Sequence, residues 1–119
     1  MNNEKTIKLC GKDVKLRYCA ATENGFEQIS GKSINDINFN SQDDITRLAV
    51  AAILAAYACN NEDAPITSDD ILYNATSTEL TELFKTIFEL RMAWYDTPKI
   101  VADALKEEQT DDEEAPKNA

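Results

Sequence analysis

Apolar and polar side chains alternate through the opening stretch TIKLCGKDVKLRY, on both sides of a single glycine. This alternation is typical of β-strands that bury one face. A two-residue turn at Gly11-Lys12, of type II′ because glycine comes first, would place Leu9 opposite Val14. Ile7 then pairs with Leu16 on the same face. The sequence therefore predicts a hairpin over residues 4–19, and this hairpin must lie on helices because a lone hairpin is marginal in water.

Helical spacing replaces alternation after the hairpin. The Ala-rich segment LAVAAILAAY carries apolar residues at i, i+3, i+4 and i+7, the pattern of a helix with one buried stripe. Ser41, Thr67 and Thr76 suit helix N-caps, and Thr22 could cap a shorter helix. Thr97-Pro98 is expected to break the last helical run. We predict helices at about 22–30, 42–59, 68–75, 77–95 and 98–107.

These elements indicate an α+β fold that is mainly α, with an N-terminal β-hairpin packed on a bundle of about four to five helices. The length of 119 residues suits one domain. We expect that domain to span residues 1–105. Residues 106–119 carry a net charge of −4 and no apolar residue except two alanines, so they are expected to form a disordered acidic tail.

Charge is unevenly distributed along the chain, whose net charge is −10. Residues 1–19 carry +3 and residues 20–119 carry −13. A body this acidic repels phosphate backbones, so no nucleic-acid partner is expected. No membrane partner is expected either, because the longest apolar run, residues 48–59, is too short to span a bilayer. Three cysteines without metal spacing or a secretory signal indicate reduced thiols in a cytoplasm.

Groups that perform catalysis are scarce. The chain has no histidine, the commonest general base and metal ligand. The acidic pairs Asp43-Asp44 and Asp69-Asp70 fall in the first turns of predicted helices, where carboxylates stabilise the free N–H groups. A magnesium site would need both pairs to converge, and nothing in their spacing requires it. We expect no enzyme activity, no metal and no cofactor.

Two sets of residues are candidates for protein binding. The aromatic helix carries tryptophan, tyrosine and arginine, which dominate interface hot spots. An alternative is that Trp94 only anchors the core. The outer face of the hairpin is basic, and it could contact an acidic partner or another copy, or be a solvated face whose lysines discourage edge pairing. The candidates are Phe88, Arg91, Trp94 and Tyr95 on the helix, and Lys8, Lys15 and Arg17 on the hairpin.

The layout resembles the tail assembly chaperones of long-tailed bacteriophages, the group typified by the lambda G protein. The residues that carry the resemblance are the hairpin IKLCGKDVKLRY, the following ATENGFEQISGKSI, the helix LAVAAILAAY, a further aromatic helix and a charged C-terminal tail. Together they cover about residues 4–107. None of these stretches is a catalytic signature.

The resemblance implies a protein that acts in the host cell cytoplasm and is not retained in the mature virion. Such chaperones bind the tape-measure protein and recruit tail-tube subunits, and self-association is expected here as well. If the basic hairpin contacts the acidic body of another copy, salt should weaken the oligomer. Two alternatives remain open: an acidic DNA mimic that inhibits a host protein, and a structural head–tail joining component.

Overall fold

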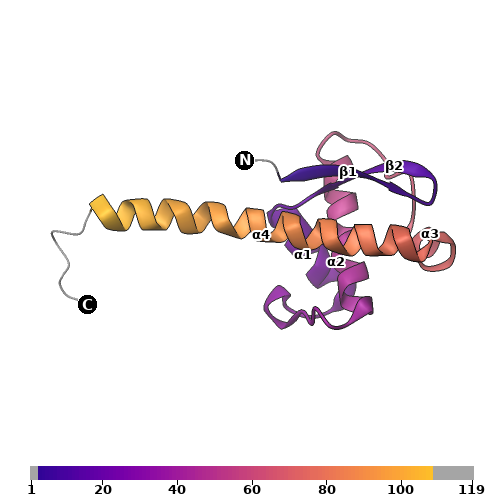
Figure 1. Cartoon of the computed structure of the whole chain (residues 1–119), viewed down its shortest axis with the longest axis horizontal. Coiled ribbons are helices and arrows are strands. Elements are labelled where there is room, and N and C mark those ends of the chain that lie inside the picture. Colours follow the sequence, from indigo (N-terminus) through magenta and orange to yellow (C-terminus); the bar gives the residue numbers. More distant parts are fainter. Residues whose placement is uncertain (1–2, 109–119) are drawn as a thin grey trace.

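The computed structural model describes the backbone of residues 3–108 and the side chains of residues 3–96. An antiparallel hairpin opens this part of the chain, and four α-helices and one short 3-10 helix follow it (Figure 1). The predicted fold class is confirmed: the fold is mainly α, with the N-terminal hairpin packed on helices. The elements are β1 Glu4–Leu9, β2 Lys12–Arg17, α1 Ala20–Ser30, η1 Ile34–Asp36, α2 Gln42–Ala58, α3 Ser68–Asn74 and α4 Ser77–Glu108.

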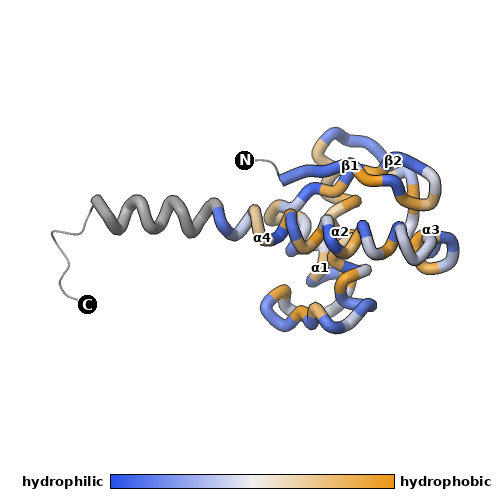
Figure 2. Tube along the Cα trace, in the orientation of Figure 1, coloured by the Kyte–Doolittle hydropathy of each residue, from blue (hydrophilic) through white to orange (hydrophobic). Residues whose placement is uncertain are grey.

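The hairpin lies across two helices, with β1 packed on α4 and β2 on α2. Its inner face buries Ile7, Leu9, Val14 and Leu16, the last three completely. Each such side chain stabilises the fold by about 1.5–3 kcal/mol relative to exposure in water. Figure 2 shows the same alternation along the strands, with apolar and polar residues following one another. The expected buried face is therefore the observed one.

The predicted strand register is wrong, although the buried face is right. Ile7 lies opposite Val14, and Leu9 lies opposite Lys12, so every partner differs by two residues from the prediction. The turn residues are Cys10 and Gly11, with φ angles of 54° and 76°. Positive φ at both positions is the requirement of a type I′ turn, whose twist matches that of the strands.

Contacts with the helices hold this turn in place. The Cys10 thiol donates to the carbonyl oxygen of Asp70 at 3.4 Å, and the Gly11 N–H donates to the Glu79 carboxylate at 3.3 Å. A cysteine in the left-handed region is strained on its own. The turn therefore moves one position toward the N-terminus because α3 and α4 supply acceptors there.

The helix starts follow the capping chemistry of the sequence, with one exception. The Thr76 hydroxyl accepts from the Glu79 N–H at 3.1 Å, and the Glu79 carboxylate accepts from the Thr76 N–H at 3.0 Å, a reciprocal capping box. Ser41 and Thr67 accept in the same way at the starts of α2 and α3. Thr22 is not the N-cap of α1, because the helix begins two residues earlier. It lies at the third helical position, where its hydroxyl accepts from the N–H of the N-cap residue Cys19 at 3.2 Å and donates to the carbonyl oxygen of Arg17 at 2.6 Å.

The break expected at Thr97-Pro98 is also wrong. α4 continues from Ser77 to Glu108 as one helix of 32 residues. Proline has a helical φ, so its backbone can remain within a helix, although it removes one N–H donor and its ring crowds the carbonyl group of residue i−4. The first three residues of the expected tail are therefore helical, and residues 109–119 lie outside the described part of the chain.

Candidate protein-binding site

The basic face of the hairpin lies on the outside, as expected, but its charges have partners within the chain. Lys8 is 2.9 Å from Asp13, and the guanidinium of Arg17 is 3.0 Å from Glu4. Ion pairs this exposed contribute little to stability. These ion pairs do reduce the positive electrostatic potential that the hairpin presents to a partner.

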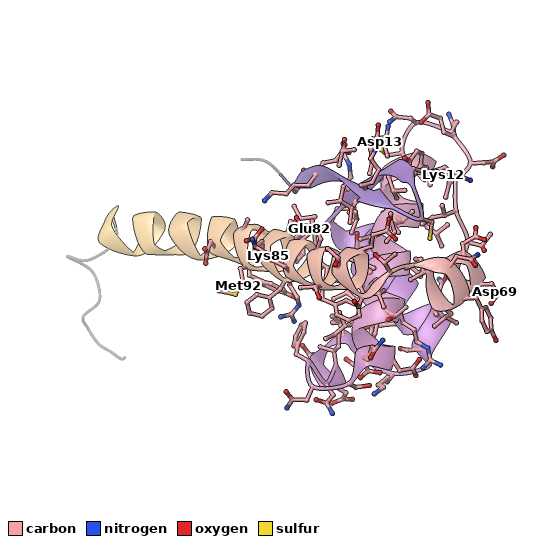
Figure 3. All side chains as sticks on the ribbon, turned by 45° about the vertical axis from the view of Figure 1, so that its right-hand side comes forward. Lys12, Asp13, Asp69, Glu82, Lys85 and Met92 are labelled. Atoms are coloured by element: carbon pink, nitrogen blue, oxygen red, sulfur yellow. The ribbon has the colours of Figure 1, made fainter. Side chains whose placement is uncertain are left out.

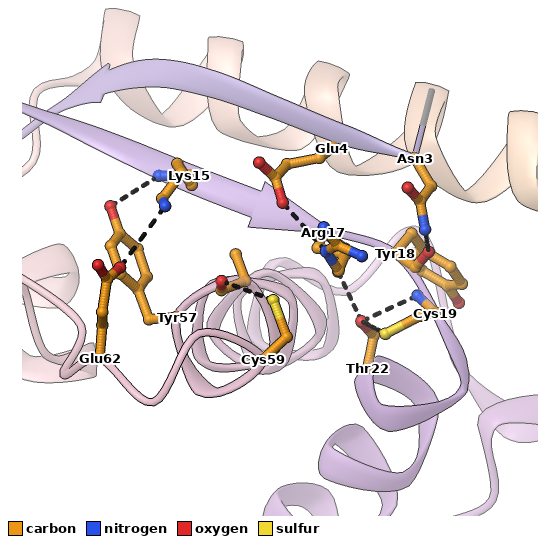
Figure 4. Close-up of polar contacts among 11 residues, drawn as sticks. Asn3, Glu4, Lys15, Arg17, Tyr18, Cys19, Thr22, Tyr57, Cys59 and Glu62 are labelled. Atoms are coloured by element: carbon orange, nitrogen blue, oxygen red, sulfur yellow. Dashed lines mark hydrogen bonds and ion pairs between the residues drawn. The ribbon is translucent and has the colours of Figure 1, made fainter. Parts of the chain in front are cut away.

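Lys15 lies on the same face and connects β2 to the end of α2. Its ammonium is 3.6 Å from Glu62 and 4.9 Å from the centre of the Tyr57 ring. Its backbone N–H, which points away from β1, donates to the Tyr57 hydroxyl at 3.1 Å (Figure 4). Tyr57 thus covers part of the outer edge of β2, and Lys15 contributes to the fold.

Arg91 and Trp94 bind α4 to the N-terminal part of the molecule. The guanidinium of Arg91 donates to the Tyr18 hydroxyl at 3.2 Å and lies 5.0 Å from the Phe39 ring centre. The half-buried Trp94 ring is 5.5 Å from the Tyr18 ring. Aromatic contacts of this kind add about 0.5–1.5 kcal/mol to the burial of the rings. Both side chains therefore have an anchoring role within the chain.

Tyr95 joins the same cluster through Glu23. The carboxylate of Glu23 accepts from the hydroxyls of Tyr18, at 2.8 Å, and of Tyr95. Burial first, and then the hydrogen bond to Glu23, raise the pKa of Tyr18 well above its usual range. The pKa of Tyr95 is raised for the same two reasons. Both phenols therefore stay protonated and act as donors at neutral pH.

Phe88 differs from these three residues because half of its surface is exposed. It contacts the Phe39 ring edge-on, with 5.8 Å between ring centres, and leaves 48% of its surface to solvent. Met92, one helical turn further on, is 50% exposed. Figure 3 labels Met92 and Lys85 on α4, and both are exposed. Of the predicted helix residues, Phe88 is the one most available to a partner.

A second apolar surface is a groove between α1, α2 and α3, with a volume of about 590 Å³. Leu54 of α2 and Leu72 of α3 line it while remaining 49% and 61% exposed. Ile29 of α1, 42% exposed, also lines it. Large exposed side chains gathered around one hollow are typical of binding sites. Other apolar lining residues are Val50, Ile53, Ile66 and Ile71.

Polar residues also line the groove. Asp43 and Arg47 of α2 are among them and form an i, i+4 ion pair of 3.1 Å. Thr67 and Ser68, at the start of α3, also line the groove, and the neighbouring Asp69 is exposed (Figure 3). Apolar residues accompanied by polar and charged ones are the usual composition of a protein interface.

The sequence interpretation missed this groove, although α2 carries a signal for it. Asp43, Arg47, Val50 and Leu54 fall at i, i+4, i+7 and i+11 and share one side of the helix. That side lies opposite the core stripe of Leu48, Ala49, Ala52 and Ala56. Helix α2 is thus apolar on two faces, which a helix with one packed face does not need.

Cysteine and acidic side chains are the candidate reactive groups of the described residues. Within the described residues, no three His, Cys, Asp or Glu side chains lie close enough to hold a metal ion. Burial, together with the nearby carboxylates of Glu79 and Asp70, raises the pKa of the Cys10 thiol and keeps it protonated. No helix in that part of the chain is long and apolar enough to cross a bilayer.

The groove is therefore the candidate binding surface, because its apolar lining suits an apolar side chain of another protein. Comparisons with protein-family models, with curated proteins and with solved structures found no match to this chain.

Proposed function

We propose that this protein is a non-enzymatic tail assembly chaperone of a long-tailed bacteriophage. In this proposal it binds the tape-measure protein in the host cytoplasm, recruits tail-tube subunits and leaves before the virion is complete. The observation that carries the proposal is the apolar groove of about 590 Å³ on a body with a net charge of −13 over residues 20–119.

The groove supports the proposal because it fits a helix with apolar side chains. Val50 and Leu54 both line the groove and are four residues apart on α2, so their side chains are about one helical turn apart on the same side of this helix. A client helix with apolar residues at i and i+4 would place these residues against Val50 and Leu54, in the mode by which amphipathic helices bind hydrophobic grooves.

The negative charge of residues 20–119 supports a second requirement of a chaperone, which is to keep its complexes with the client from aggregating. A long tape-measure helix exposes apolar stripes and aggregates when these stripes meet. A partner that covers the stripes and carries many like charges keeps the complexes apart, because equal net charges repel one another. A small acidic protein with an apolar groove meets both requirements.

Co-expression with the tape-measure protein tests the proposal. The wild-type chain is expected to increase the soluble fraction of the tape-measure protein, and Leu54→Asp is expected to lose this effect because it places a charge in the groove. Tyr73→Asp is the matched control, since Tyr73 is 81% exposed and does not line the groove.

Two results would contradict the proposal. A wild-type chain that leaves the client insoluble would remove the chaperone function. A Leu54→Asp variant as active as wild type would move the client site away from the groove. Detection of the chain in purified virions would instead favour the structural joining component.

A further inference from the structure

The segments that form the groove are strongly acidic. Helices α1, α2 and α3, together with the loop of residues 59–67 between α2 and α3, carry eight carboxylates and one basic residue, Arg47. Negative charge around an apolar site attracts cationic ligands and repels anionic ones. The charge of these segments therefore restricts which helices can enter the groove.

Three of the eight carboxylates have a cationic partner within the described residues. These ion pairs are Lys15–Glu62, Lys32–Asp44 and Arg47–Asp43. Arg47 is the one basic residue that lines the groove, and its guanidinium already binds Asp43, so the groove offers no free cation to an acidic ligand. The other five carboxylates form no ion pair in that part of the chain, and they belong to Glu23, Glu27, Asp63, Asp69 and Asp70.

Asp69 is the unpaired carboxylate that lies beside the groove and is free to bind a ligand. It follows Ser68 and precedes Leu72 by three residues, and both of these residues line the groove. Residues three positions apart are neighbours on one side of a helix, so Asp69 adjoins the exposed Leu72. Asp69 is exposed and makes no hydrogen bond within the described residues, whereas the carboxylate of Asp70 accepts from the Thr67 N–H at 2.9 Å.

We propose that the groove binds a basic amphipathic helix. Two apolar side chains of this helix contact Val50 and Leu54, and a lysine or arginine beside them pairs with Asp69. The long aliphatic part of that basic side chain lies along Leu72 while its charged end reaches the carboxylate. This inference rests on the proposed function, because the groove is the client site, and it adds the charge that the client helix carries.

The two kinds of contact have different roles. Burial of the apolar side chains supplies most of the affinity, as it does for other helices bound in grooves. An exposed ion pair adds little affinity, but it selects among ligands because a like charge at the same place is repelled. An acidic helix with the same apolar residues is therefore rejected by the groove.

Two model peptides test the charge of the ligand on the purified full chain. Both have about 18 residues, enough to form a helix, and both carry leucines at i and i+4. One has lysines on either side of the leucines and the other has glutamates there. In fluorescence anisotropy at low ionic strength, the lysine peptide is expected to bind at least about tenfold more tightly. Added sodium chloride should reduce this ratio, because salt screens exposed charges.

A pair of charge reversals tests the role of Asp69. Asp69→Lys and Glu82→Lys change the net charge by the same amount, but Glu82 is an exposed residue of α4, which does not line the groove (Figure 3). Asp69→Lys should reduce the preference for the lysine peptide at least about threefold more than Glu82→Lys does. Leu54→Asn, which changes no charge, should weaken binding of both peptides, and circular dichroism checks that each variant is folded.

Equal binding of the two peptides to the wild-type chain would overturn the inference, and so would a lysine peptide that does not bind. Equal effects of Asp69→Lys and Glu82→Lys would also overturn it, since the preference would then come from the overall charge. A chain that solubilises the tape-measure protein without preferring the lysine peptide would reject the basic ligand and leave the chaperone function standing. A clear preference in a chain that leaves the tape-measure protein insoluble would do the reverse.

Discussion

Gly25 of α1 lies directly against Ala51 of α2. A Cβ atom at Gly25 would be 3.2 Å from the Cβ of Ala51, closer than side-chain atoms normally approach. Gly25 lies within a helix of 11 residues, where glycine is about 1 kcal/mol less favourable than alanine. The close crossing of α1 over α2 explains its presence, because even an alanine here would require Ala51 to move by a few tenths of an ångström.

Gly25→Val is therefore expected to destabilise the fold by about 1–3 kcal/mol, because its side chain would force the helices apart. Urea unfolding followed by circular dichroism measures the change. Ala21→Val, at an exposed position of the same helix, controls for the helix propensity of valine and should cost about 0.5 kcal/mol. Addition of Ala51→Gly should recover part of the loss, and strictly additive effects would show that the two residues do not press on each other.

Trp94→Ala is expected to lower the free energy of unfolding by about 1–3 kcal/mol, because the half-buried ring packs on Tyr18. Met92→Ala, at an exposed position two residues earlier on the other side of α4, should stay within about 0.5 kcal/mol of wild type. Unfolding is measured at a concentration where the chain is monomeric. Unchanged stability of Trp94→Ala together with lost client binding would assign Trp94 to an interface after all.

Thr76→Ala is expected to cost about 1 kcal/mol, because it removes the oxygen that accepts from the Glu79 N–H at the start of α4. Thr81 is a matched control on the same helix: its hydroxyl donates to the carbonyl oxygen of Ser77, which already belongs to the helix. Thr81→Ala should be neutral or slightly stabilising. Thermal unfolding measures both variants. Equal losses of stability in Thr76→Ala and Thr81→Ala would mean that the capping box does not stabilise the fold.

Asp44 makes stability depend on acid pH. The bond from the Lys32 ammonium, at 2.7 Å, and then the bond from the Asn38 N–H, at 3.0 Å, lower the pKa of Asp44. Since the folded-state pKa is below the unfolded-state value of about 3.9, the carboxylate stabilises the fold above that pH. The contribution is lost as the pH falls through the lowered folded-state pKa.

Asp44→Asn should therefore melt at a lower temperature than wild type at pH 7, and the difference should shrink toward pH 3. Asp36→Asn is a suitable control, because Asp36 is exposed in η1. A difference between Asp44→Asn and wild type that stays constant from pH 7 to pH 3 would contradict the lowered pKa.

Local chemistry determined much of this fold from the sequence alone. Alternation set the buried face of the hairpin, and reciprocal capping by Thr76 and Glu79 set the start of α4. These features depend on residues a few positions apart, whose side chains and N–H groups are brought together by the local backbone. The fold class followed from them, and so did the surplus of apolar residues on α4.

Only the tertiary structure decided the features in which distant segments meet. A shift of two residues leaves every hairpin side chain on the same face, so the apolar pattern fits both registers, and acceptors on α3 and α4 select the turn at Cys10 and Gly11. The groove has the same origin, because Ile29, Leu54 and Leu72 become neighbours only when three helices pack. Sequence spacing reports which side of an element is apolar, whereas the packing of the elements decides which apolar sides remain uncovered.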